Sequence, residues 1–135
     1  MPRVKGAIRK RTARLINNFS KYWLPLYIYA AVIFYISSRQ TPLSGIDIPF
    51  LDKALHIGEY MIFGFLACRA FRSSPRKLFL ENFKIFAILV SLLYGVSDEI
   101  HQLSVSTRQF SVLDIFADGI GGMLGVFVYG KYCPL

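Results

Sequence analysis

The chain has 135 residues, of which 54% are hydrophobic, 16% aromatic and only 18% charged, and its formal net charge is +8. So much apolar surface excludes a disordered chain, and two cysteines in 135 residues cannot define a disulfide scaffold. The length allows at most one soluble domain. The excess of positive charge suggests nucleic-acid binding until the charges are placed along the chain.

Residues 1–21 form a basic arm with seven Lys or Arg residues and no acid. An uncharged apolar run follows over residues 22–38, and its 17 residues reach the lower limit for crossing a hydrocarbon core about 30 Å thick. The run is long for a signal peptide and no small-x-small cleavage site follows it, so we interpret it as an uncleaved first membrane span. Residues 39–51, rich in Pro and Gly, are expected to form a loop.

Three more helices are expected, each long enough to cross the membrane once at about 1.5 Å per residue. They cover residues 52–71, 84–103 and 111–131. A basic segment interrupted by Pro75 (72–83) and a short polar turn (104–110) connect them. The prediction is an all-α fold, a four-helix transmembrane bundle, with residues 22–131 as its membrane domain.

The basic residues predict the orientation. With four spans, the arm, the 69–84 region, Lys131 and the tail at 132–135 lie on one side, and that side carries 13 Lys or Arg residues against 3 on the other. Because positive charge gathers on the cytoplasmic side, both termini are predicted to be cytoplasmic. The basic arm is then a topology signal that also binds anionic lipid, and nucleic acid is not an expected partner.

The acidic residues have the opposite distribution. Only Glu81 falls on the predicted cytoplasmic side. The others belong to the outer loops or the outer halves of the helices, as do both histidines: Asp47, Asp52, Glu59, Asp98, Glu99, Asp114, Asp118, His56 and His101. Four helices with their ionisable groups at one end predict a polar pocket that opens outward.

Helical spacing supports convergence of these side chains. Each of the last three helices carries a polar stripe whose members share a face. The stripes are Asp52, His56 and Glu59; Asp98, His101 and Gln102; and Asp114 and Asp118. An ionisable side chain facing lipid costs several kcal/mol, so the stripes are expected to face one another or water.

Simpler interpretations remain open for several of these residues. Asp52, Lys53 and Asp114 fit a solvated helix end, and Asp114 with Ser111 fits a helix cap. Tyr60 fits a packing or interfacial aromatic residue. Glycines of the last helix, including the Gly121–Gly125 pair, indicate close helix packing within the bundle, with homodimerisation as the less favoured alternative.

Three ordered motifs covering roughly residues 23–130 resemble the VanZ-like family of membrane proteins. They are Asp52-Lys53-x-x-His56-x-x-x-Tyr60, Tyr94-Gly95-x-x-Asp98-Glu99-x-His101-Gln102, and Arg108-x-x-Ser111-x-x-Asp114 followed by Gly119 and Gly122. The chain departs from the family pattern in two places. Ser106-Thr107 stand where a Val-Pro-Gly-like turn is common, and Asp118 stands where asparagine is common.

The resemblance implies an integral membrane protein of about four helices, which we place in the bacterial cytoplasmic membrane as a multi-pass protein. The family takes its name from an association with resistance to the glycopeptide teicoplanin, which acts on cell-wall precursors outside the membrane. The resemblance supplies no biochemical activity, so the chemistry has to be argued from the residues.

One hypothesis is an enzyme that hydrolyses or transfers a group on a lipid-linked anionic envelope precursor at the outer leaflet. A fork of the Arg108 guanidinium would hold a phosphate or carboxylate. His56 or His101 would transfer a proton, oriented by Asp98 or Glu99. The candidate catalytic residues are His56, Glu59, Asp98, Glu99 and His101, and the candidate substrate-binding residues are Asp52, Lys53, Tyr60, Gln102, Arg108, Asp114 and Asp118.

Other hypotheses use the same residues. In the first, a non-catalytic protein binds a lipid head group or a partner protein, and it modulates the envelope or glycopeptide susceptibility by occupancy. An ion or proton pathway is less favoured because the cytoplasmic halves of the helices have no matching acids. A metal site built from His56, His101 and carboxylates is also less favoured, because the sequence has no compact HxxxH or HxH motif, and no metal ligand is assigned.

Overall fold

The computed structural model describes residues 12, 16–39, 50–105 and 110–133, and every element in these ranges is helical. In chain order the elements are the π-helical turn η1 (Phe19–Trp23) and the helices α2 (Leu24–Ser37), α3 (Leu51–Arg72), α4 (Lys77–Glu81), α5 (Phe83–Gln102) and α6 (Val112–Tyr132). The predicted all-α fold is confirmed. The last three predicted helices begin and end within one residue of α3, α5 and α6.

The structure differs from the prediction at the start of the first helix and in the connection between α3 and α5. The first helical segment begins before the apolar run, because η1 continues directly into α2 and includes Lys21. The connection 72–83 contains the short helix α4, which Pro75 and basic composition did not suggest. Phe79 of α4 packs edge-to-face on Phe71, with ring centroids 5.5 Å apart, and on Phe86, at 4.7 Å. The expected loop 39–51 and turn 104–110 lie largely outside the described residues.

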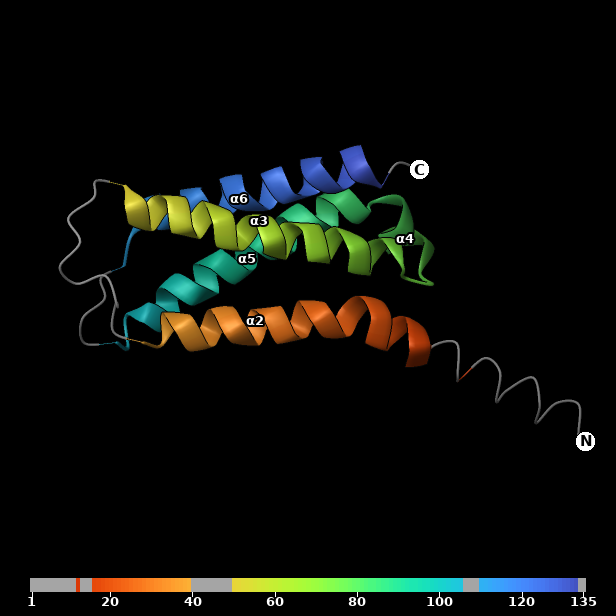
Figure 1. Cartoon of the computed structure of the whole chain (residues 1–135), viewed down its shortest axis with the longest axis horizontal. Coiled ribbons are helices and arrows are strands. Elements are labelled where there is room, and N and C mark those ends of the chain that lie inside the picture. The colour runs from red at the N-terminus through yellow and green to blue at the C-terminus, as the bar shows by residue number, and fades with distance from the viewer. Residues whose placement is uncertain (1–11, 13–15, 40–49, 106–109, 134–135) are drawn as a thin grey trace, which may run out of the picture.

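The four long helices run along the same axis, with α5 inclined across the others (Figure 1). The start of η1, the end of α3, the start of α5 and the end of α6 lie at one end of the bundle. The end of α2, the start of α3, the end of α5 and the start of α6 lie at the other (Figure 1). Arg69 and Arg72 of α3 and Lys84 of α5 lie toward the first end, whereas Lys53 of α3 and the acids and histidines of both helices lie in the half toward the second. The two ends therefore differ in charge.

Helix α6 packs on α3 at backbone distance because glycines form its contact face. A Cβ atom on Gly121 would lie 2.5 Å from the carbonyl oxygen of Ile57, and one on Gly125 would clash with the Met61 carbonyl oxygen and lie 2.7 Å from the Phe65 nitrogen. The predicted role of these glycines in packing within the bundle is therefore confirmed. The contact fixes how far α6 can sit from α3, and so where the side chains of α6 reach.

Helix α2 is held to this core by aromatic side chains. Tyr29 donates a hydrogen bond to the backbone carbonyl of Glu59, at 3.2 Å, and Tyr94 of α5 donates one to the carbonyl of Ala30, at 2.6 Å. Phe63 of α3 and Tyr94 of α5 stack on each other, with ring centroids 4.9 Å apart. The hydroxyls thus satisfy backbone carbonyls while the rings fill the apolar interior.

The two glycine environments on α3 and α6 predict opposite effects of adding one methyl group. Gly125→Ala is expected to destabilise the protein by about 1–3 kcal/mol, because its Cβ meets backbone atoms that cannot rotate away. Gly58→Ala is the matched control, since nothing lies within 4 Å of its Cβ position, and alanine favours helix by up to about 1 kcal/mol. Thermal unfolding of detergent-purified protein should show a lower midpoint for Gly125→Ala alone. Equal midpoints would contradict the packing assigned to α6.

Candidate polar site

The polar end of the bundle contains a buried pair between α3 and α6. His56 donates from Nδ1 to Asp118 Oδ1 at 2.8 Å, and the two residues are 7% and 0% exposed. Gly95 of α5 makes room for the carboxylate, because a Cβ there would lie 2.7 Å from Asp118 Oδ2. That second oxygen has no hydrogen-bond partner in the described part of the chain. Asp118 therefore holds the imidazole while keeping one oxygen unused.

Glu99 brings α5 into the same cluster. Its Oε2 accepts a hydrogen bond from the backbone N–H of Ser111 at 2.8 Å, just before the first turn of α6. Ser111 in turn caps α6, because its hydroxyl accepts from the N–H of Asp114 at 3.3 Å. The predicted cap is confirmed. Glu99 is fully buried, and no group among the described residues hydrogen-bonds its Oε1.

Lys53 lies at the rim of the cluster between two carboxylates. Its Nζ is 2.5 Å from Asp114 Oδ1 and 2.7 Å from Asp52 Oδ2. The side chain of Asp52 is 57% exposed, that of Lys53 23% and that of Asp114 10%. The exposure therefore falls along this chain of charges, which leads from solvent toward His56 and Glu99.

Asp98 and Gln102 form a second buried pair one turn apart on α5. Gln102 donates from Nε2 to Asp98 Oδ2 at 3.0 Å, and Asp98 Oδ1 lacks a hydrogen-bond partner within the described ranges. Tyr60 is fully buried beside Phe63 and Tyr94. Its position fits packing, and its hydroxyl has no hydrogen-bond partner among the residues described.

His101 is placed apart from His56. Its ring stacks on Phe34 of α2, with centroids 4.1 Å apart, and its Nε2 lies 2.9 Å from Ser38 Oγ. Since Ser38 gives its own proton to the Phe34 carbonyl at 2.6 Å, His101 is the donor in this contact. The stripe predicted on α5, which comprised Asp98, His101 and Gln102, does not converge as a whole on α3 and α6, because His101 meets α2. Glu99, which was not part of that stripe, meets α3 and α6.

The remaining predicted site residues are Glu59 and Arg108. Glu59 is half-buried, and its backbone carbonyl is the acceptor for Tyr29 of α2. Arg108, expected to hold an anionic group, lies outside the described residues. Sequence reasoning missed Ser38, which ends the apolar run that was interpreted only as a span. It also missed the space-making role of Gly95, although that residue stands in the second motif.

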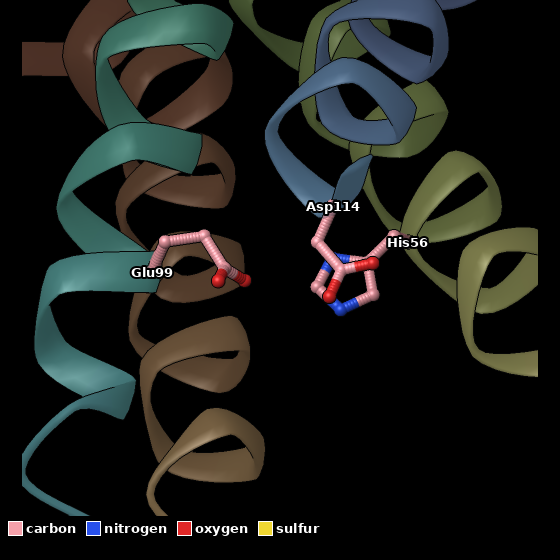
Figure 2. A group of neighbouring side chains, drawn as sticks. All are labelled: His56, Glu99 and Asp114. Atoms are coloured by element: carbon pink, nitrogen blue, oxygen red, sulfur yellow. The ribbon is translucent and has the colours of Figure 1, made fainter. Parts of the chain in front are cut away.

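Figure 2 shows Glu99 reaching from α5 toward Asp114 of α6 and His56 of α3. One ligand atom from each of these buried side chains lies within 4.8 Å of the others. The arrangement offers an imidazole, two carboxylates and a nearby ammonium in a site shielded from water. Such a set can bind a cation, hold an anionic group through Lys53, or move a proton.

Comparison with known proteins supports the resemblance seen in the motifs. The model of the VanZ/LLP1 family matches residues 6–131 of the chain. No significant match was found among curated proteins or among solved structures. The family match includes all of the polar residues described above and ends one residue before the end of α6.

The buried His56–Asp118 pair predicts strong coupling between the two side chains. His56→Ala is expected to cost about 3–5 kcal/mol of stability, because it leaves the Asp118 carboxylate buried without its partner. Adding Asp118→Asn should recover part of this loss, so that the double variant is less destabilised than the sum of the single variants. Thermal midpoints of the three purified variants measure the coupling. Lys77→Met, which breaks an exposed ion pair with Glu81, is the control and should change little. Strictly additive shifts would contradict the pair.

Proposed function

The chain belongs to the VanZ/LLP1 family, and on this premise we propose a function in the bacterial cytoplasmic membrane. The protein is a multi-pass membrane protein whose polar cluster binds an anionic, lipid-linked envelope precursor at the outer leaflet and hydrolyses it or transfers a group from it. The observation that carries this proposal is the convergence of His56, Glu99, Asp114 and Asp118, all buried, at the end of the bundle opposite most of the basic residues.

The exposed surface of the helices supports a membrane location. Two helical segments, Ile16–Ser37 and Val112–Tyr132, are long and apolar enough to cross a membrane. Helices α3 and α5 have 22 and 20 residues and also expose large apolar side chains, such as Ile62 on α3 (48%) and Leu93 on α5 (68%). Apolar surface on all four helices suits lipid contact. We therefore extend the proposal to four spans with both termini cytoplasmic.

Two positive groups at the rim of the cluster are proposed to hold the anionic head group. Lys53 is partly exposed at its rim and supplies positive charge, and we assign the second positive contact to Arg108 on its motif position alone. In hydrolysis or transfer, the attacking water or hydroxyl gives its proton to a base as its oxygen bonds to the head group, and the leaving oxygen takes up a proton. His56 is favoured over His101 as that base, because His56 adjoins Glu99 and Asp114.

The orientation can be tested with single cysteines in a variant without Cys68 and Cys133. Cysteine at position 44 or 106 should react with an impermeant thiol reagent added outside spheroplasts, because both positions are assigned to the outer side. Cysteine at position 73, in the connection between α3 and α4, should react only after the membrane is opened. Labelling of position 73 alone from outside would reverse the proposed orientation.

The site can be tested by expressing variants in a host that lacks its own copy of the gene. Glu99→Gln, Asp98→Asn and Arg108→Ala should each abolish the envelope phenotype, measured as growth at graded teicoplanin concentrations, at normal membrane abundance. Arg108→Lys should also fail, because an ammonium cannot copy the guanidinium fork. His101→Ala should lose less activity than Glu99→Gln. Glu81→Gln is the matched control, since Glu81 is exposed at the opposite end of the bundle.

Mass spectrometry of the lipid extracts separates the enzyme from a binding protein. An enzyme predicts that the Glu99→Gln strain accumulates a lipid-linked precursor that the wild-type strain converts. A protein that acts by occupancy predicts the same loss of phenotype with unchanged precursor lipids. Full phenotype in the three site variants at normal abundance would contradict both.

A further inference from the structure

Three buried side chains from three helices surround one point at the polar end of the bundle. His56 of α3, Glu99 of α5 and Asp114 of α6 each place a ligand atom within 4.8 Å of the other two (Figure 2). They are 7%, 0% and 7% exposed. Imidazole and carboxylate groups at this spacing are ligands of divalent transition metals.

The Glu99 carboxylate gives a second, independent indication that a cation binds here. Its Oε2 is used by the backbone N–H of Ser111. Its Oε1 is buried and has no hydrogen-bond partner in the ranges that the structure describes. A buried, unpartnered carboxylate oxygen is costly unless a cation or a proton satisfies it.

The His56–Asp118 contact sets the imidazole for ligation. Because Nδ1 donates its proton to Asp118, a neutral ring has its lone pair on Nε2. Metal-binding histidines are commonly oriented by a carboxylate on their other nitrogen, which also raises their basicity. Asp118 is fully buried and Gly95 provides the room that it needs, so this orienting contact is built into the packing.

The balance of charge also favours a cation. Four buried carboxylates gather here, those of Asp98, Glu99, Asp114 and Asp118. Within the described residues, the side chains that form ion pairs with these carboxylates are Lys53, which pairs with Asp114, and His56, which pairs with Asp118. Lys53 contacts Oδ1 of Asp114, and since a carboxylate has two oxygens, this ion pair is compatible with ligation through the other oxygen.

We propose that His56, Glu99 and Asp114 bind one divalent transition-metal ion of the Zn²⁺ class, with Asp118 orienting His56. Three protein ligands leave an open coordination position, as in catalytic zinc sites. The inference deepens the proposed function and rests on it for its role. With the ion bound, His56 would be a ligand and no longer the base, and the ion would activate the attacking water by lowering the pKa of that water.

The test uses the full chain, purified in detergent, stripped with a chelator and dialysed against Zn²⁺ in excess Mg²⁺. Elemental analysis should find about one Zn²⁺ per chain in the wild-type protein. Glu99→Gln and Asp114→Asn should each lose the ion, and Asp118→Asn should weaken binding about 10–100-fold. His101→Ala is the control for adventitious histidine binding and should retain it. Co²⁺ in place of Zn²⁺ should give visible absorption bands that Glu99→Gln removes while remaining monodisperse.

Several results would overturn the metal site. These are monodisperse wild-type protein without bound Zn²⁺, Zn²⁺ retained in full by Glu99→Gln, or equal loss in His101→Ala and Glu99→Gln. The metal site and the proposed function fail separately. Absence of Zn²⁺ with loss of phenotype in Glu99→Gln removes only the metal, whereas bound Zn²⁺ with a full phenotype in the ligand variants removes only the proposed function.

Discussion

Glycines on one face of α6 remove the Cβ atoms that would hold this helix away from its neighbours. Gly121 and Gly125 meet the backbone of α3, and Gly122 meets Ser91 of α5. At this separation the short side chain of Asp118 can reach His56. A larger spacing would leave a buried carboxylate without its imidazole. The close approach of the helices therefore determines whether these charged groups can be buried without a large loss of stability.

The polar side chains also connect the end of α5 to the start of α6. Glu99 accepts from the backbone nitrogen of Ser111, and Ser111 caps the first turn of α6. A negative group at a helix start is favourable because the first N–H groups have no partner within the helix. The residues proposed to act on a ligand thus also set where α6 begins relative to the end of α5. In Glu99 the two roles use different oxygens of one carboxylate, Oε2 for the contact with Ser111 and Oε1 for a ligand.

The long helices could be predicted from the sequence because apolar runs and their polar ends have strong local signals. The existence of α4 could not, since it depends on the packing of Phe79 against rings of the two neighbouring helices, Phe71 of α3 and Phe86 of α5. The convergence of His56 with Asp118 followed from the rule that buried charges must meet. The direction of His101 did not, because helical spacing gives relative angles within α5 but not which neighbour each face meets.

The division of α5 between two neighbours has a chemical consequence. Glu99 and His101 are two residues apart, so they project to nearly opposite sides of the helix. One side is anionic and closed by α3 and α6, and the other carries an imidazole whose proton is committed to Ser38. A histidine that already donates to a hydroxyl and stacks on Phe34 is well suited to hold α2 against α5. Among the described residues, Oε1 of Glu99 and Oδ2 of Asp118 are buried without a hydrogen-bond partner, and both carboxylates lie on the α3–α6 side, so chemistry that needs an unpaired carboxylate oxygen belongs there.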